Sequence, residues 1–341
     1  MIAKVKQGRM EGLDILKCIS CIGVVSLHIF QQGEGDANGI AFFCFGYSIP
    51  IFFMVNGYLL LSKKEIRLSY IFQKGLDVIL FAFWWNLAWS LFRFVYKGEC
   101  LNPITETLKN LFLQDGYFYV FWFLGALICV HMTAPILHKI LQSKWWWIPL
   151  AVLFLICNAV DILSMATTGR TGKALQSFIP QTFRLWTWCF YFYLGGCIAK
   201  KGEKVSGLKK CRWIPLAVFF INVVYEYFIG VKIFGINLPE YFYDNILLMV
   251  ETYFLFTVLY QIKKEQWKNL IIMASSASVG IYPLHVIVIN YSWKIYGFQN
   301  VVLNAIAVIL FFSGSLLAVL AMQKIPLVRR LVNISGVAKK K

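Results

Sequence analysis

Charged residues are scarce in this sequence. They make up 14% of its 341 residues, whereas 59% are hydrophobic and 17% are aromatic. A soluble domain carries about 25% charged residues and needs polar groups to cover its surface. The shortage therefore excludes an ordinary soluble globular protein, and the apolar content excludes a disordered or collagen-like chain. A membrane protein that crosses the bilayer several times remains.

Acidic residues are scarcer still. The chain has 16 Asp and Glu against 33 Lys and Arg, which gives a net charge of +17. In a soluble protein such an excess would indicate nucleic-acid binding. In the topology predicted below, however, 25 of the 33 basic residues lie on one side of the membrane and eight on the other. Because cytoplasmic loops collect Lys and Arg, this asymmetry places both termini in the cytoplasm and predicts no nucleic-acid partner.

The nine cysteines form no pattern of disulfides or paired metal ligands. Cys100 stands alone among the predicted outer connections, and nearly all the others fall in or beside apolar segments. Cys18 and Cys21 have the spacing of a metal or redox pair, but no second pair accompanies them. We interpret them as small packing residues, and no metal site is predicted.

Apolar segments long enough to cross a bilayer, which takes roughly 20 residues, recur along the chain. The sequence therefore predicts an all-α polytopic membrane helix bundle. Its parts are a cytoplasmic segment at 1–12, a membrane domain at 13–323 and a basic cytoplasmic tail at 324–341. The first apolar segment is long and lacks a small-residue cleavage site, so we interpret it as a retained span. About ten transmembrane helices are expected, near residues 13–31, 42–62, 70–96, 118–138, 145–163, 183–200, 213–230, 244–262, 270–291 and 300–323.

Three ionisable residues occur in the first predicted span. Ionisable groups are costly inside a bilayer, so each is a candidate functional residue. Asp14 and Lys17 are three residues apart and able to pair. Lys17 and His28 are eleven residues apart, so they lie about 20° apart around the helix and roughly 16 Å apart along its axis. The three side chains therefore share one face of the helix.

Simpler interpretations exist for each of these residues. Asp14 and Lys17 can serve as an interfacial ion pair that only anchors the helix, and His28 can be a packing histidine. The shared face favours a catalytic site over these alternatives. In such a site a buried neutral imidazole is suited to act as a general base, so we predict that role for His28.

Residues in other spans extend the candidate site. Asn56 in the second span needs a partner at membrane depth. Lys74 and Arg67, near the start of the third span, are suited to phosphate groups, although basic residues there also determine orientation. The predicted binding residues are Lys74, Arg67, Asn56, Trp122, Tyr282 and His285.

Three further ionisable residues lie inside predicted spans. His131 in the fourth span is expected to pack rather than to act. Glu226 and Glu251, in the seventh and eighth spans, are expected to be paired or neutralised, because a bare carboxylate is costly there.

Five short motifs, taken in order, resemble those of the acyltransferase family 3 proteins. No motif is specific alone, but their order and spacing match the ten-span layout of that family over nearly the whole chain. They are LDILK at 13–17 with His28 eleven residues further on, IPIFFMVNGY at 49–58, WFL at 122–124, YFYLGG at 191–196 and IYPLH at 281–285. The stretch FRLWTW at 183–188 resembles the membrane part of the serine racemases of vancomycin resistance.

The resemblance implies an O-acyltransferase. Such an enzyme moves an acetyl or other short acyl group from cytoplasmic acyl-CoA to a hydroxyl of an extracytoplasmic glycan, lipid-linked sugar or cell-wall component. It also implies a multi-pass protein of a bacterial plasma membrane, with acyl-CoA as co-substrate and no permanently bound cofactor. The first-span histidine of the family falls on His28. Its first-span arginine falls on Lys17, which keeps the charge but loses the planar fork of the guanidinium.

In the expected mechanism, Lys17 with Lys74 or Arg67 holds the donor phosphates, and Asp14 orients Lys17. The pantetheine arm extends along the first span and brings the thioester to His28. Asn56, Tyr282 or His285 stabilises the oxyanion, and an acyl-histidine intermediate is not distinguished from direct transfer. The alternative is a membrane carrier for a small solute such as an amino acid, which would use the same polar face as its path.

Overall fold

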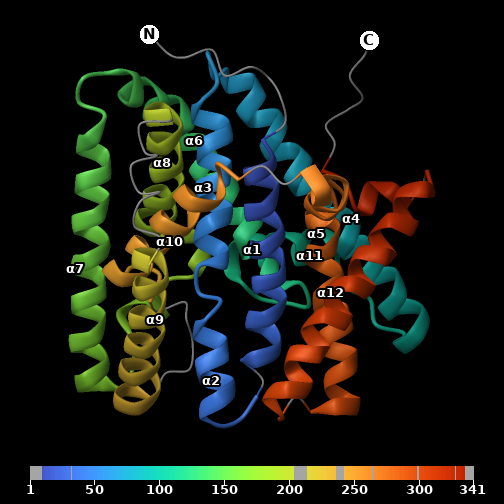
Figure 1. The fold of residues 1–341 in the computed structure, drawn as a ribbon. Helices are drawn as coiled ribbons and strands as arrows, with labels where there is room; N and C mark the ends of the chain where they lie inside the picture. The colour runs from blue at the N-terminus through green and yellow to red at the C-terminus, as the bar shows by residue number, and fades with distance from the viewer. Residues whose placement is uncertain are drawn as a thin grey trace.

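The chain folds into a bundle of helices, which a computed structural model shows in Figure 1. The structure describes residues 10–31, 33–202, 213–235, 242–262, 265–297, 299–326 and 328–334, and every regular element among them is helical. The helices that correspond to the predicted spans are α1 (Glu11–Phe30), α3 (Ser48–Leu61), α4 (Leu68–Lys97), α6 (Trp122–Gln142), α7 (Trp147–Thr171), α8 (Leu185–Lys201), α9 (Trp213–Tyr227), α10 (Ile246–Leu259), α11 (Lys268–Tyr296) and α12 (Val301–Lys324).

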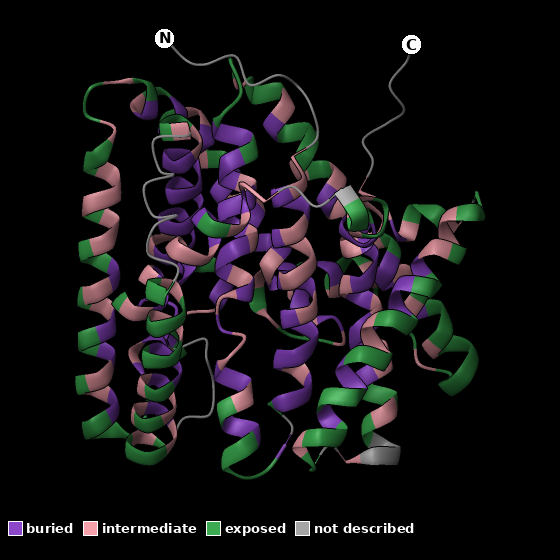
Figure 2. Cartoon of the chain, viewed as in Figure 1, coloured by how far each residue is buried: buried purple, intermediate pink, exposed green. Residues whose placement is uncertain are grey.

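Eight segments of the described chain are long and apolar enough to cross a membrane, so the protein is a multi-pass membrane protein. The other two predicted spans are the helices α8 and α10, which have 17 and 14 residues. Both are shorter than the roughly 20 residues that a lipid-facing span needs. Helix α8 packs against α3, α6 and α7, and Figure 2 shows it mostly buried, so protein rather than lipid surrounds it.

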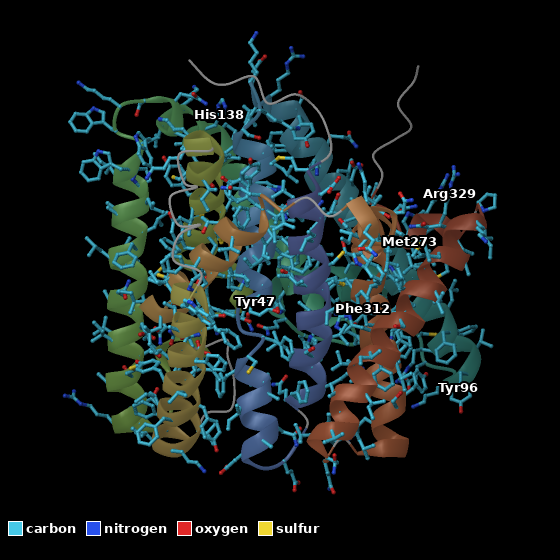
Figure 3. The ribbon with its side chains drawn as sticks, viewed as in Figure 1. Tyr47, Tyr96, His138, Met273, Phe312 and Arg329 are labelled. Atoms are coloured by element: carbon cyan, nitrogen blue, oxygen red, sulfur yellow. The ribbon has the colours of Figure 1, made fainter. Side chains whose placement is uncertain are left out.

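The orientation of the helices agrees with an even number of crossings. Helix α1 begins and α12 ends toward the same end of the bundle (Figure 1). His138 on α6 lies toward this end, whereas Tyr96 at the end of α4 lies at the opposite end (Figure 3). Some basic residues of the predicted cytoplasmic side lie outside the described residues, namely Lys4, Lys6, Arg9, Lys204, Lys209, Lys210, Arg212, Lys263, Lys264, Lys339, Lys340 and Lys341.

The predicted span at 42–62 is divided in the structure. The short helix α2 (Asp36–Phe43) ends at a turn, and α3 begins at Ser48. The hydroxyl of Ser48 donates to the carbonyl of Phe45 across this turn at 2.7 Å. Pro50 lies in the first turn of α3, where its missing N–H leaves no helical hydrogen bond unmade. Apolar composition alone does not reveal such a break.

Small residues let three central helices approach closely. A Cβ atom on Gly57 of α3 would overlap the carbonyl oxygen of Phe192 on α8, and one on Gly195 of α8 would overlap that of Met54 on α3. A Cβ on Gly23 of α1 would overlap the hydroxyl of Ser48. Such contacts are typical of helix pairs in membranes, where close backbone packing replaces the hydrophobic effect. Helix α1 also packs against α11 and α12, so it lies at the centre of the bundle.

Candidate functional site

A cavity of about 350 Å³ lies among α1, α3, α4, α6 and α11. Its volume is in the range of sites that hold small molecules. The cavity gathers residues that are far apart in the sequence, such as His28 and His285, which are separated by 257 positions. Seven of the nine predicted site residues line it, namely Lys17, His28, Asn56, Lys74, Trp122, Tyr282 and His285.

Helix α1 supplies one long wall of the cavity. Lys17, Cys21, Val24 and His28 line it at intervals of four, three and four residues, which is one face of a helix. Because α1 is unbroken from Glu11 to Phe30, Lys17 and His28 are roughly 16 Å apart along its axis. The cavity therefore extends over roughly 16 Å along α1, about half of the roughly 30 Å hydrocarbon core of a bilayer.

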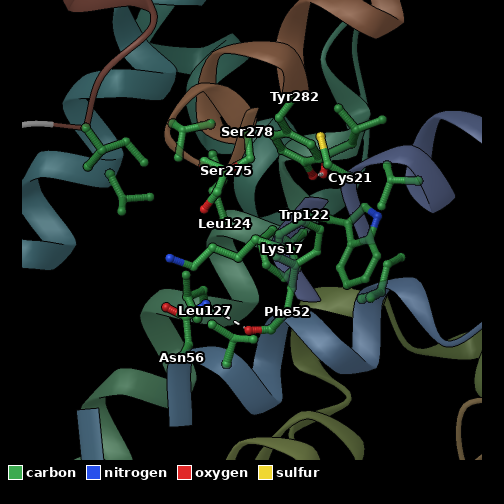
Figure 4. A pocket seen from close by; sticks show the side chains of 18 of the residues that line it. Lys17, Cys21, Phe52, Asn56, Trp122, Leu124, Leu127, Ser275, Ser278 and Tyr282 are labelled. Carbon is green, nitrogen blue, oxygen red and sulfur yellow. Dashed lines mark hydrogen bonds between the residues drawn. The ribbon is translucent and has the colours of Figure 1, made fainter. Parts of the chain in front are cut away.

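One end of the cavity is basic, and we call it the basic end, after Lys17 and Lys74. The Nζ of Lys17 lies 3.9 Å from Oδ1 of the buried Asp14, which also accepts a 2.6 Å hydrogen bond from the hydroxyl of Ser275. Asp14 does not line the cavity but fixes two residues that do. In Figure 4 the Lys17 side chain extends into the cavity, with Ser275 on one side and Asn56 on the other.

Asn56 belongs to this same end. Its Nδ2 donates to the carbonyl of Phe52 at 2.9 Å, drawn as a dashed line in Figure 4. Helix α3 runs antiparallel to α1, and Ser48 faces Gly23. Eight residues further along α3, Asn56 is about 12 Å from that level, in the direction of Lys17. Asn56 is thus too far from His28 to stabilise an oxyanion there.

Two histidines form the opposite end, which we call the histidine end. The ring centroids of His28 and His285 are 5.1 Å apart, and the planes are tilted by 39°. The hydroxyl of Tyr119, in the short helix η2 (Tyr119–Phe121), lies 3.4 Å from Nδ1 of His28. Since Tyr119 occupies Nδ1, Nε2 is the nitrogen of His28 that remains for a substrate.

The remaining oxyanion candidates have their protons committed elsewhere. The hydroxyl of Tyr282 donates to the carbonyl of Val120. Nδ1 of His285 lies 3.3 Å from the carbonyl oxygen of Ile281, and since a carbonyl only accepts, Nδ1 carries the proton. The neutral ring then presents a lone pair at Nε2. None of the three predicted candidates therefore offers a free N–H or O–H beside His28 in this arrangement.

Between the two ends the walls are apolar. Val24, Ile49, Leu124 and Leu127 line this stretch, with Trp122 among its aromatic residues. The Trp122 ring packs against Trp188, with a centroid distance of 5.3 Å, and the residue is 5% exposed. A thin, uncharged chain is the kind of ligand that such a stretch accommodates.

The structure does not bring Arg67 into the cavity. Arg67 precedes α4, is exposed, and pairs with the equally exposed Glu65 at 3.4 Å. Among the described residues, Lys17 and Lys74 are therefore the lysines that supply the basic end of the cavity.

Sequence reasoning missed part of the site. His131, interpreted above as a packing residue, is buried but lines the cavity within electrostatic reach of Lys74. Ser275 and Ser278 line it together with Tyr282 and His285. These four residues follow one another at intervals of three, four and three positions, which places them on one face of α11. This spacing is visible in the sequence and predicts that they act together. No sequence pattern predicts the position of Tyr119, because that position depends on how α6 begins.

A second buried polar group lies apart from the cavity. Nδ2 of Asn222 donates to Oε2 of Glu251 at 2.7 Å, so Glu251 has a hydrogen-bond partner. Glu226, one turn further along α9, is fully buried, and its two carboxylate oxygens have no hydrogen-bond partner among the described residues. These three residues do not line the cavity.

Comparisons with known proteins agree with the motifs. Residues 10–323 match the family described as "Acyltransferase domain", so the match covers nearly the whole chain. No solved structure matches the chain.

Two similar proteins are racemases. The chain is 24% identical to a serine/alanine racemase of Enterococcus gallinarum, over 89% of this chain and 45% of that protein. It is also 24% identical to an amino-acid racemase of Enterococcus faecalis, over 97% of this chain and 50% of that protein. The chain thus spans about half the length of these relatives.

Proposed function

The chain belongs to the acyltransferase family that matches its residues 10–323, and from this premise we propose that it carries an acyl group across the membrane from acyl-CoA to a hydroxyl. The acceptor in this proposal is an extracytoplasmic glycan, lipid-linked sugar or cell-wall component, and the membrane is the plasma membrane of a bacterium. The observation that carries the proposal is that one cavity reaches both Lys17 and His28.

The basic end is the proposed donor site. Acyl-CoA carries phosphates at one end and a thioester at the end of a long, thin pantetheine arm. Lys17 and Lys74 supply positive charge for the phosphates, and Asp14 holds Lys17 in place at 3.9 Å. The apolar stretch accommodates the arm, whose extended reach is comparable to the roughly 16 Å between Lys17 and His28.

The histidine end is the proposed reaction site. Nε2 of His28 removes the proton of the acceptor hydroxyl as the oxygen attacks the thioester carbonyl, and the thiolate leaves. A positioned general base contributes typically 10²–10⁴-fold to the rate. The alternative in which His28 itself carries the acyl group uses the same nitrogen and the same cavity.

The test uses the full chain in lipid nanodiscs with radiolabelled acetyl-CoA and a panel of glycan and lipid-linked acceptors. The proposal predicts a labelled, alkali-sensitive ester on at least one acceptor. Absence of transfer and of thioester hydrolysis, with solute uptake into proteoliposomes that is independent of acyl-CoA, would overturn it.

A second candidate function is a carrier for a small solute such as an amino acid. Membrane-embedded carboxyl groups frequently mark proton or solute paths, and the buried Glu226 and Glu251 are of this kind. The relatives named as racemases act on amino acids by their names. Uptake of labelled serine or alanine into proteoliposomes distinguishes this function from acyl transfer.

A further inference from the structure

His285 holds a nitrogen atom without a hydrogen-bond partner in the interior of the protein. The residue is 1% exposed, and its Nδ1 donates to the carbonyl of Ile281. Nε2 is buried and has no partner among the described residues. An unsatisfied buried acceptor costs free energy, so such an atom requires an explanation.

The surroundings of His285 leave few donors for this nitrogen. Tyr282 packs beside it, at a centroid distance of 5.9 Å, but its hydroxyl proton is committed to Val120. The ring of His28 is closer, with its centroid at 5.1 Å. A neutral His28 with its proton on Nδ1, facing Tyr119, has no N–H to give. A protonated His28 does, at Nε2.

We infer that His285 is a positioning residue whose Nε2 accepts a hydrogen bond from His28 at the moment when His28 holds the catalytic proton. This inference rests on the proposed acyl transfer. The O–H bond of the acceptor breaks as Nε2 of His28 takes the proton, the new C–O bond forms, and the C–S bond of the thioester breaks. The N–H of His28 is then shared between the new ester oxygen and Nε2 of His285 until the departing thiolate takes the proton, which yields ester and free thiol.

The apolar surroundings give this contact its value. An imidazolium among buried apolar groups is poorly stabilised unless an acceptor is present. Val25 and Ile289, with Phe30 of the same helix as His28, belong to the buried apolar cluster at this end of α1. An acceptor that is fixed in advance stabilises the charge where it forms, as in other preorganised active sites.

Two substitutions separate this role from simple packing. His285→Gln keeps an acceptor atom near the position of Nε2, whereas His285→Phe keeps an aromatic ring and removes the acceptor. Both lose the contact to Ile281, so they are matched in that respect. A hydrogen bond to a charged group contributes about 1.5–3 kcal/mol, so we expect His285→Phe to lower kcat by about 10- to 150-fold. His285→Gln should retain roughly tenfold more activity than His285→Phe. KM for acetyl-CoA should be unchanged in both variants, because the basic end is roughly 16 Å away.

The measurement is acyl transfer by the full chain in nanodiscs, with thermal unfolding recorded for each variant. If His285→Phe is unstable, His285→Leu serves as the apolar variant, with the same expected order. A Phe variant that is as active as the Gln variant, or more so, would overturn the inference while leaving the proposed function intact. Failure of the unsubstituted chain to transfer an acyl group to any acceptor would overturn both.

Discussion

The phenol oxygen of Tyr119 lies 3.4 Å from Nδ1 of His28, although the two residues are 91 positions apart. The contact engages one ring nitrogen of His28 and leaves the other, Nε2, for a substrate. A histidine with one nitrogen held by the protein and the other facing a substrate is the usual arrangement of a general base.

Removing this contact tests its contribution. Tyr119→Phe takes away the hydroxyl and keeps the ring, so we expect kcat to fall roughly 2- to 10-fold, in line with the loss of one hydrogen bond of about 0.5–1.5 kcal/mol. The donor KM should not change. The measurement is steady-state acyl transfer over a range of acetyl-CoA concentrations. A change confined to KM for acetyl-CoA, with kcat unaffected, would show that Tyr119 does not act through His28.

The two lysines of the basic end should affect donor binding. Lys17→Ala and Lys74→Ala each remove a charge from the cavity, so we expect KM for acetyl-CoA to rise about tenfold or more, with a smaller effect on kcat. With acetyl-pantetheine, a donor without the nucleotide phosphates, the same variants should match the unsubstituted chain.

Arg67→Ala is the matched control for these lysines, because Arg67 is exposed, pairs with Glu65 and lies outside the cavity. It should leave KM for acetyl-CoA unchanged. An effect of Arg67→Ala as large as that of Lys74→Ala would place the phosphates outside the cavity and contradict the proposed donor site.

Close packing of α3 on α8 predicts a stability effect. In Gly57→Ala the added methyl group would overlap the backbone carbonyl of Phe192, which has no rotamer to escape into. We expect the free energy of unfolding to fall by about 1–3 kcal/mol, seen as a lower thermal midpoint in detergent. Gly314→Ala on α12 is the control, since no atom lies within 4 Å of its added Cβ. Equal midpoints for the two variants would contradict the described packing.

The buried residue Glu226 distinguishes the two candidate functions. Glu226→Gln keeps the shape of the side chain and removes its ionisable group, and Glu226 does not line the cavity. If the protein is an acyltransferase only, transfer by this variant should stay within about twofold of the unsubstituted chain. Loss of serine or alanine uptake in the variant, with uptake by the unsubstituted chain, would support the carrier instead.

Much of the fold follows from the sequence, because bilayer thickness sets the length of apolar segments. The sequence places α1, α4 and α12 within a few residues of their observed bounds. It misses the division of 42–62 into α2 and α3, since a turn buried among other helices can be as apolar as the helices it joins. It also does not show that α8 is enclosed by its neighbours, because only tertiary packing determines that.

The site is predictable where its residues share one helix. The helical period alone predicts that Asp14, Lys17 and His28 share one face of the first span. In the structure Lys17 and His28 line the cavity, and Asp14 pairs with Lys17. Contacts between helices do not follow from any period. The position of Tyr119 against His28 and the exposure of Arg67 depend on how helices cross and where α4 begins.

In the proposed reaction, His28 takes the proton during acyl transfer from acyl-CoA. The most direct measurement is the rate of labelled acetyl transfer to an acceptor by His28→Ala in nanodiscs, compared with His138→Ala. His138 lies outside the cavity, with Nε2 2.9 Å from the carbonyl of Lys63. We expect a rate about 10²–10⁴-fold lower for His28→Ala, with acetyl-CoA still bound, and a nearly unchanged rate for His138→Ala. Full transfer by a folded His28→Ala protein would contradict it.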